Sequence, residues 1–528
     1  MVELAIILGI FGNLVFGLGL WGKLFLIKPL TLLLAVVLGG LMVQKKMWLA
    51  VWGFWKKVKK DKIALGLLAF GGAQAGVNLI GALGPELGFD ALWYHLTIPK
   101  IYLQFGQIFY LRGGLYYYSA MPKLTEMFYL ASLAFSPAGT LAKLIHFSFG
   151  LLSAAALYYL AKRYLKLRGA LIAAVMFYTT LIVGWESISA YVDLSRTFFE
   201  ILALDLFLRW SEKRKPADLY ESAIMLGLAL SVKLLAFFSL PVFLILTFWK
   251  SHKIQLVLKY FIFTLIVPLP WLIWSTLKTG NPIYPIFSGI LDQTHALVLN
   301  PLSWGKEFFS FFIHPQDPIS PIFLIFLPLL IFGLVKMIKE NKNSGLKKLS
   351  FYFGGVMLGL MVTPNTGGAR FLLPYLPVWS LLTVIMVEQS TRFLKRVLLV
   401  LVILTAGVNL GYRALANWKF VPVIIGRQSR TDFLSRNLKF DFGDFYDVDG
   451  RLDQLINHDW VYVIGGHNWF YADFPFVHES FSSFVPGLGY ILTQNAILPE
   501  KFQGAREIYA NSQTKIRLYL INPFGQND

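Results

Sequence analysis

The stretch GFDALWYHLTIPK, residues 88–100, places an acid, a tyrosine, a histidine and a lysine among large apolar residues. Its acid, Asp90, directly precedes ALWYHL, where a carboxylate can cap a helix by accepting a backbone N–H. The same carboxylate can act as a general base, because a helix starting here places it on one face with Trp93, Tyr94 and Thr97. Capping lowers the pKa of a carboxyl and weakens it as a base, so both interpretations stay open from these residues alone.

Two cations in apolar surroundings point to an anionic ligand. Lys233 lies in GLALSVKLLAFFSLP, with no acid one helical turn away in either direction. Arg370 follows a glycine-rich turn in TPNTGGARFLLPYLP, and its planar guanidinium suits a phosphate group. A lipid phosphate at the level of the headgroups would satisfy both charges. For Arg370, an ordinary arginine reaching the membrane surface explains the position equally well.

Other charged residues fit structural roles. Glu186 and Asp193 flank the short connection WESISAYVD, and we expect Glu186 to be solvated at a helix end. Arg196 and Glu200 are four residues apart in an apolar run, so they can pair along one face of a helix. Their presence in the run therefore does not by itself require a ligand.

The chain offers little for a metal or a nucleotide. It contains no cysteine, which excludes a disulfide framework, a thiolate nucleophile and a Cys-ligated metal. Its histidines have no metal-ligand spacing such as HExxH, and no Walker or dinucleotide-binding loop follows a predicted strand. The residues alone predict no cofactor.

The composition decides the class of fold. The 528 residues are 56% hydrophobic and 15% charged, with a mean hydropathy of +0.60, which is far too apolar for a soluble globular protein. We predict an all-α polytopic membrane protein with about 11–13 transmembrane helices. The formal charge of +19 is spread between the apolar runs, so anionic membrane lipids, and not nucleic acid, are the expected partner of the Lys and Arg side chains.

Apolar runs of membrane-spanning length recur over the first four-fifths of the chain. The predicted spans are 3–22, 27–44, 63–84, 139–161, 168–187, 191–210, 217–234, 236–250, 255–276, 319–338, 348–364, 370–388 and 395–413. The first two can also be interpreted as a re-entrant pair, because lysines and a proline interrupt them.

Basic residues fill alternate connections between these spans, and all of these connections fall on one side. They are residues 45–62, 162–168, 213–215, 250–253, 336–348 and 392–396. The positive-inside rule makes this side cytoplasmic. We therefore expect a multi-pass protein of the plasma (inner) membrane, with the N-terminus inside and the C-terminus outside.

Three regions follow from this topology. Residues 1–62 form an N-terminal pair of spans with a basic cytoplasmic loop, 63–413 a transmembrane module, and 414–528 an extracytoplasmic domain. Two long connections, about 85–138 and 277–318, lie on the outer side, and the first of them carries Asp90.

The outer regions also have predicted elements. Residues 121–135 have an apolar face at helical spacing but are too short and polar to span, so we expect an interfacial helix. Strand-like alternation at 460–466 and 516–522 predicts a small α/β C-terminal domain. This domain, with His467 and Tyr471, either helps to bind an acceptor or caps the site, and capping is the simpler interpretation.

Five segments occur in the order seen in one class of membrane enzymes: GFDALWYHLTIPKIYLQFG, AYVDLSRTFFEILAL, GLALSVKLLAFFSLP, TGNPIYP and GGARFLLPYLP. Over about residues 63–413 the chain resembles the GT-C class of membrane glycosyltransferases. It is similar to the protein O-mannosyltransferases and the lipid A aminoarabinose transferase, of the glycosyltransferase family 39 type. The resemblance implies transfer of a sugar from a polyprenyl-phosphate carrier to a hydroxyl of a lipid, glycan or protein acceptor on the outer membrane face.

The resemblance also implies roles for individual residues. Asp90 matches the catalytic acid position and would act as general base, with Asp193 as the candidate second acid. The candidates for contacts with the carrier phosphate are Lys100, Lys233 and Arg370, and those for contacts with the acceptor or substrate are Glu86, Tyr94 and His95. A divalent metal is compatible with the class, but no paired-acid motif supports it, because Phe89 and Gly88 precede Asp90.

A sugar on a phosphate carrier is already activated, so neither a nucleotide nor a covalent nucleophile is required. We expect one direct displacement, with inversion at the anomeric carbon. A secondary transporter or lipid flippase is the main alternative, but no repeated halves are evident in the sequence. A lipid-linked oligosaccharide ligase, which would share the donor type, and a scaffold without catalysis are the others.

Overall fold

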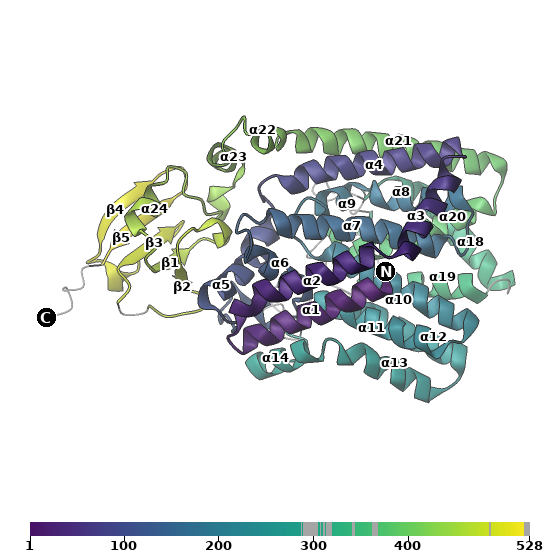
Figure 1. Cartoon of the computed structure of the whole chain (residues 1–528), viewed down its shortest axis with the longest axis horizontal. Helices are drawn as coiled ribbons and strands as arrows, with labels where there is room; N and C mark the ends of the chain where they lie inside the picture. The colour runs from purple at the N-terminus through teal and green to yellow at the C-terminus, as the bar shows by residue number, and fades with distance from the viewer. Residues whose placement is uncertain are drawn as a thin grey trace.

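The protein is described here from a computed structural model, in which a helical bundle carries a small sheet domain at one end (Figure 1). The structure describes residues 1–286, 319–340, 344–361, 368–484 and 487–521, and the single positions 288, 305, 306, 308, 309 and 312. Most of the predicted outer connection 277–318 and part of the basic connection 336–348 lie outside the described residues.

The bundle begins with long apolar helices and continues through shorter ones that pack against them. The helices up to the first outer loop and its exit are α1 (Val2–Leu20), α2 (Ile27–Met42), α3 (Lys45–Val58), α4 (Lys62–Leu83), α5 (Thr97–Phe105), α6 (Leu124–Leu133) and α7 (Thr140–Ala161). Those of the middle are α8 (Leu167–Tyr178), α9 (Leu181–Glu186), α10 (Asp193–Lys213), α11 (Pro216–Val232), α12 (Ser239–Ser251), α13 (Ile254–Ile266) and α14 (Leu269–Thr279). The last are α17 (Ile322–Ile325), α18 (Leu327–Glu340), α19 (Ser344–Met361), α20 (Leu376–Glu388) and α21 (Arg392–Trp418).

The helical, multi-pass membrane class is confirmed. Within the described residues, seven helices are long and apolar enough to cross a membrane, or up to eight if the bent pair α13–α14 forms one span. This number is smaller than the 11–13 predicted, for physical reasons. Helix α10 carries Asp193, Arg196 and Glu200 along its length, while α8 and α11 have only 12 and 17 residues. These helices are nevertheless buried in the same bundle.

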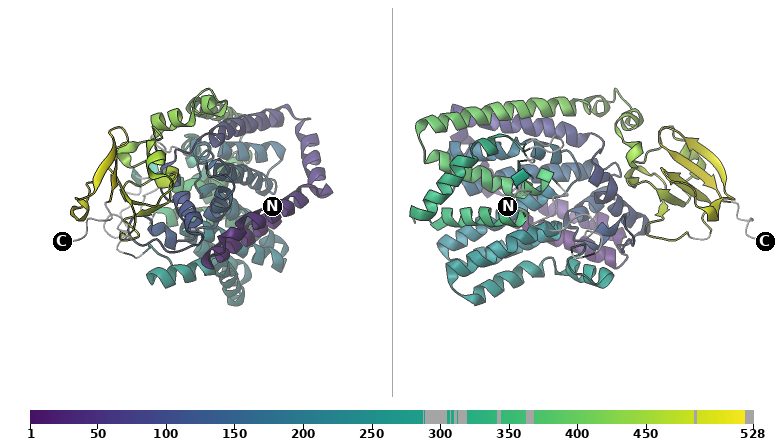
Figure 2. Two further views of the ribbon diagram at one scale, coloured as in Figure 1. Left: turned by 60° about the vertical axis from the view of Figure 1, so that its left-hand side comes forward. Right: turned by 180° about the vertical axis from the view of Figure 1, so that it is seen from behind.

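The basic connections that the structure describes gather at one end of the bundle. The turn from α12 to α13, with basic residues at 250–253, and the turn from α20 to α21, with those at 392–396, lie opposite the sheet domain (Figure 1). The same arrangement is visible from behind in Figure 2. The predicted alternation of basic and less basic connections thus corresponds to the two ends of the bundle.

The helix expected at the membrane surface is part of the protein interior. All ten residues of α6 are buried, and it packs against α1, α5 and α7. Its polar residues find partners inside: the hydroxyls of Thr125 and Ser195 are 2.6 Å apart, and Glu126 contacts His95. Its sequence has a polar face because that face meets buried polar groups, and not because it meets water.

The predicted C-terminal strands are confirmed within a five-stranded sheet. After α22 (Val421–Ile424), α23 (Arg430–Asn437) and α24 (Arg451–Ile456) come the strands β1 (Val461–Gly465), β2 (Phe476–His478), β3 (Tyr490–Gln494), β4 (Arg506–Asn511) and β5 (Ile516–Leu520). The order is β2-β1-β3-β5-β4; β2 and β3 run parallel to β1, whereas β5 is antiparallel to both β3 and β4. This mixed order brings the carboxyl ends of three neighbouring parallel strands to one edge of the sheet.

The sheet domain packs directly on the outer loop that carries Asp90. The Tyr471 hydroxyl donates to the Glu86 carbonyl at 2.8 Å, and the Lys100 ammonium donates to the carbonyls of Phe470, at 2.8 Å, and Ala472. These bonds join segments almost 400 residues apart in sequence, so they attach the sheet domain directly to the outer loop.

Candidate functional site

Asp90 lies in an irregular helical segment between α4 and α5. Residues Ala91–His95 form a π-helical turn, a rare conformation that is frequent at functional sites. The Asp90 carboxylate makes no capping bond to this turn. Its Oδ2 instead accepts from Nη1 of Arg370 at 2.7 Å and from the Tyr94 hydroxyl at 3.2 Å. Capping therefore does not occupy the carboxylate, and its partners are side chains.

Arg370 and Lys233 alternate with two acids to form a chain of four charges. Arg370 Nε lies 3.9 Å from Asp193 Oδ2, and Lys233 Nζ lies 2.8 Å from Asp193 Oδ1. The side chain of Asp193 is 1% exposed, while those of Asp90, Lys233 and Arg370 are 16–19% exposed. The row of charges is thus buried at Asp193 and partly exposed at the other three residues, where a ligand can approach. We call these four residues the charge cluster.

Helix breaks bring the charge cluster together. Asp193 is the first residue of α10, and Lys233 lies in the break between α11 and the 3-10 helix Leu234–Phe238. Arg370 belongs to the 3-10 helix Gly368–Tyr375, which leads into α20. Because each residue stands where a helix starts or breaks, its side chain is directed by the end of an element and not by the regular face of a long helix.

Aromatic rings border the charge cluster. The Tyr191 hydroxyl accepts from the Asp90 backbone N–H at 3.3 Å, and the Tyr191 ring lies 5.1 Å from the Arg370 guanidinium carbon. The Phe371 ring lies 5.2 Å from Lys233 Nζ. Such rings favour a nearby cation while keeping bulk water away from it. Sequence reasoning did not single out Tyr191, although it stands in the quoted segment AYVDLSRTFFEILAL.

Opposing effects set the charge state of Asp90. Burial raises the pKa of its carboxyl, but the positive charges around it, above all Arg370, outweigh burial and lower the pKa below the ordinary value. Burial and the negative charge of Asp90 raise the pKa of Tyr94 well above its ordinary value, so its hydroxyl keeps its proton and donates. While Arg370 contacts it, Asp90 is ionised but is a weak base.

Two expectations about charges are wrong. The Lys233 ammonium, which we expected to lack a protein partner, pairs with Asp193 from a different helix, a contact that the spacing along one helix cannot reveal. Glu186, expected to be solvated, is fully buried with its carboxylate 3.8 Å from Nε2 of His146. The predicted pairing of Arg196 with Glu200 is confirmed, at 2.6 Å.

The remaining candidates have structural contacts in this structure. The Glu86 carboxylate accepts backbone N–H groups of Leu87, at 2.8 Å, Gly88, at 2.7 Å, and Ala190, at 2.7 Å. It thereby fixes the loop before Asp90 to the loop before Asp193. The His95 ring contacts Glu126 at 2.9 Å. Lys100, held by two carbonyls of the sheet domain, attaches that domain to α5.

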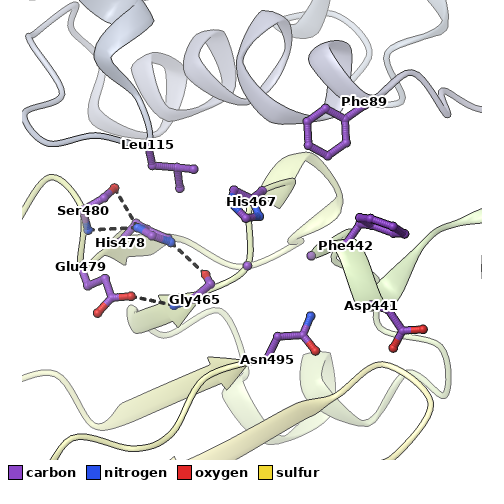
Figure 3. A pocket seen from close by; sticks show the side chains of 12 residues that line it. Phe89, Leu115, Asp441, Phe442, Gly465, His467, His478, Glu479, Ser480 and Asn495 are labelled. Carbon is purple, nitrogen blue, oxygen red and sulfur yellow. Dashed lines mark hydrogen bonds between the residues drawn. The ribbon is translucent and has the colours of Figure 1, made fainter. Parts of the chain in front are cut away.

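Two cavities lie beside this segment and share the walls Phe89 and Phe442. The first, of about 600 Å³, has four basic side chains in its wall, and we call it the basic cavity. These are Lys143, Arg413, Lys419 and Lys439. Tyr191 and Glu86 also line it, which places it next to the charge cluster. The second, of about 760 Å³, lies at the ends of the parallel strands, and we call it the strand-end cavity (Figure 3).

Among the residues that the structure describes, no three His, Cys, Asp or Glu side chains are placed to hold a metal ion together. The acids of the charge cluster face cations of the chain itself, at 2.7 and 2.8 Å.

Part of the chain is similar to a known protein family. Residues 128–274 match a family model described as dolichyl-phosphate-mannose-protein mannosyltransferase. The chain has no significant match among curated protein sequences.

The fold is similar to solved structures of ArnT from Cupriavidus metallidurans. The form bound to undecaprenyl phosphate is 11% identical, with a TM-score of 0.56 over 86% of this chain and 98% of that one. The apo form is also 11% identical, with a TM-score of 0.51 over 87% and 98% of the two chains. The archaeal oligosaccharyltransferase AglB from Archaeoglobus fulgidus is 13% identical, with a TM-score of 0.46 over 83% and 70%. The resemblance predicted from the sequence is confirmed as a similarity: residues 128–274 match the dolichyl-phosphate-mannose-protein mannosyltransferase family model, and the fold of the membrane protein is similar to that of ArnT.

Proposed function

We propose that this protein transfers a sugar from a polyprenyl-phosphate carrier to an acceptor hydroxyl, with Asp90 as the general base. One observation carries the proposal: a carboxylate and two cations from three separate helix ends meet in the charge cluster. A base and a site for a departing phosphate are what this transfer requires. The family match and the binding of undecaprenyl phosphate by ArnT support the class of donor.

Arg370 and Lys233 are proposed to bind the donor phosphate. Both are neutralised by Asp90 and Asp193 in the present structure. A phosphate arriving at the partly exposed side would compete with these carboxylates for the cations, and an Arg fork can hold two phosphate oxygens at once. Arg370 would then exchange Asp90 for the phosphate. Without its strongest counter-charge, the partly buried Asp90 becomes a better base.

The reaction needs one displacement. The acceptor oxygen bonds to the anomeric carbon as the bond from that carbon to the phosphate oxygen breaks. The acceptor proton passes to the Asp90 carboxylate, and the electron pair of the broken bond stays on the phosphate beside Arg370 and Lys233. Because attack and departure occur on opposite sides of the same carbon, the configuration inverts.

The basic cavity is the proposed approach for the carrier. It lies against the end of α21 and the segment that follows α4, the two helices whose spans have only 22% of their residues buried and so offer most of their surface to lipid. Arg413 and Lys419 can attract the carrier phosphate before it reaches Arg370. Lys143 has a structural role, since it donates to the carbonyls of Gly81, Gly84 and Pro85.

We further propose that the site lies outside the cytoplasm, in the plasma (inner) membrane, with the N-terminus inside. Support comes from the basic turns α12–α13 and α20–α21, which lie at the end of the bundle opposite the sheet domain. Positively charged connections favour the cytoplasmic side. Fusing a reporter that is active on only one side of the membrane after residue 521 tests this, and cytoplasmic activity would contradict it.

The function itself is tested by a transfer assay with purified protein in lipid vesicles and a panel of polyprenyl-phosphate sugars. We expect one donor to be consumed by the wild type, slow transfer by Asp90→Asn, and an inverted product. Glu388→Gln is the matched control, because this half-exposed acid pairs with Lys395 at the far end of the bundle. Retained configuration would overturn the displacement, and full activity of Asp90→Asn would remove Asp90 from it. If no donor reacts although undecaprenyl phosphate binds, a transporter or scaffold is favoured.

A further inference from the structure

The strand-end cavity collects the residues that follow each of the three parallel strands. Gly465 is the last residue of β1, and Gly466 and His467 follow it. His478 is the last residue of β2 and is followed by Glu479 and Ser480, and Asn495 directly follows β3. Loops at the carboxyl ends of neighbouring parallel strands are where open α/β sheets bind their ligands, especially where connections leave in opposite directions. Here β2 and β3 lie on opposite sides of β1. The cavity is thus at the position in the sheet where a ligand site is expected.

Hydrogen bonds hold the floor of this cavity in place. The ring of buried His478 contacts the Gly465 carbonyl through Nε2 at 2.9 Å, while its Nδ1 accepts the backbone N–H of Ser480 at 3.0 Å (Figure 3). Glu479 accepts the Gly465 N–H at 2.8 Å. Burial lowers the pKa of His478 to about 4, so the ring stays neutral and keeps both contacts near neutral pH.

Gly465 itself has no room for a side chain. Its φ is +73°, and a Cβ there would lie 2.3 Å from the Gln494 carbonyl oxygen. The turn after β1 can therefore press against β3, and the polar groups around it are positioned before any ligand arrives.

The open parts of the wall have the chemistry that recognises sugars. Asp441, Glu479 and Asn495 are exposed and offer carboxylate and amide groups, which can bond neighbouring hydroxyls. Phe89 and Phe442, with 42% and 67% of their surfaces exposed, offer rings for the C–H face of a pyranose. Figure 3 shows these rings approaching the cavity from the helices and from the sheet domain.

The charge of the strand-end cavity disfavours anionic ligands. None of the described residues that line it is Lys or Arg, whereas Asp441 and Glu479 are acidic. A phosphate-bearing ligand would be repelled here and attracted to the basic cavity on the other side of Phe89 and Phe442. The two cavities therefore differ in the charge of the ligand that they favour.

We propose that the strand-end cavity binds the acceptor, and that this acceptor is a neutral carbohydrate. The proposal rests on the proposed function, because it names the acceptor of the same reaction. Phe89, in the cavity wall, is the residue next to Asp90, so the cavity lies beside the segment that carries the proposed base. The C-terminal domain then binds substrate, in addition to covering the site.

Binding of neutral oligosaccharides to the purified full chain tests this without any transfer. Ligand-observed NMR with a panel of gluco-, manno- and galacto-configured di- and trisaccharides should identify a binder. Asp441→Asn and Phe442→Ala should each weaken it about tenfold, since each removes one recognition element from an exposed position. Asp459→Asn, an exposed acid of the same domain outside the cavity, should leave binding unchanged.

The outcomes separate this inference from the proposed function. If oligosaccharides bind and the cavity variants lose them, the inference holds even when no donor is consumed. If transfer proceeds but no oligosaccharide binds, or the Asp441→Asn and Phe442→Ala variants bind as the wild type does, the inference is overturned. Binding of peptides in place of sugars at this cavity would also overturn it. Undecaprenyl phosphate affinity should be the same in both variants, because its proposed contacts are with Arg370 and Lys233.

Discussion

Replacing Asp90 by Asn should slow transfer and at the same time tighten binding of the carrier. The carboxylate has two effects in the charge cluster. It accepts the acceptor proton in the proposed reaction, and it neutralises Arg370 at 2.7 Å while no donor is bound. An amide cannot take the proton, and it competes only weakly with a phosphate for the guanidinium.

The sizes of the two effects can be estimated. Loss of a positioned base costs about 10²–10⁴-fold in kcat. Two unit charges at about 4 Å interact by ~4 kcal/mol at an effective dielectric constant of ~20, before exposure to water and competition from other charges reduce the net value. Both side chains are about one-sixth exposed, at 16% and 17%, and Asp193 remains 3.9 Å from Arg370. A net gain of about 1.5 kcal/mol, or about tenfold tighter binding, is therefore expected.

Two measurements on the same preparation check this. Titration of undecaprenyl phosphate gives its Kd, and initial rates with the reactive donor give kcat. Asp90→Glu should recover part of the rate. Glu388→Gln should change neither quantity, since this residue ends α20 and pairs with Lys395 of α21, outside the charge cluster. A residue with only a structural role would weaken binding and rate together. Weaker binding in Asp90→Asn would therefore refute the exchange of Arg370 between carboxylate and phosphate.

Three further predictions follow from the same contacts. Arg370→Gln should lower kcat by about 10²–10³-fold and weaken undecaprenyl phosphate binding, and Arg370→Lys should restore part of both because it keeps the charge without the fork; unchanged affinity in Arg370→Gln would contradict this. Arg370 lowers the pKa of Asp90 in the free protein, whose ionisations are reported by kcat/KM, whereas in the bound complex, reported by kcat, the phosphate shares Arg370. The acidic limb of the kcat/KM profile should therefore lie at lower pH than that of the kcat profile. Coincident acidic limbs in the two profiles, measured from initial rates, would argue against this. Glu86→Gln should reduce the Tm and kcat, because one amide oxygen cannot accept all three backbone N–H groups, yet leave the pH profile in place; a shifted profile would indicate a direct role in proton transfer.

The sequence predicts individual elements well where local pattern decides them. Hydropathy predicts the helical membrane class, and strict alternation predicts β1 and β5, because these signals depend only on neighbouring residues. Helix α6 was misjudged, since a polar face looks the same in sequence whether it meets water or buried residues such as Ser195. Among the described residues, helices such as α10, whose charges are paired inside the bundle, were predicted as spans but are not apolar enough to count as candidate spans by composition.

The residues of the candidate site could be predicted from the sequence, but the ion pairs between them could not. Asp90, Lys233 and Arg370 stand out because charges are rare in apolar surroundings, whatever their partners are. The contacts Lys233–Asp193 and Arg370–Asp90 join residues 40 and 280 positions apart, and no periodicity encodes them. Lys100 was proposed as a phosphate contact from the family resemblance, and in the structure its ammonium donates to carbonyls of a domain that begins more than 300 residues later, a contact that no local pattern encodes.

The pairing of Arg370 with Asp90 also gives the reaction an order. A base that is always strong would take a proton from water and activate that water to attack the donor. The donor would then be hydrolysed without transfer of its sugar to the acceptor. In the free protein the guanidinium lowers the pKa of Asp90, so the base is weak until a phosphate draws Arg370 away. The basic cavity and the strand-end cavity share Phe89 as a wall, and Phe89 is the residue next to Asp90, so both proposed substrate sites lie beside the segment that carries the base. Carrier binding should therefore precede productive acceptor binding, and initial rates varied in both substrates should give an ordered pattern with the carrier first.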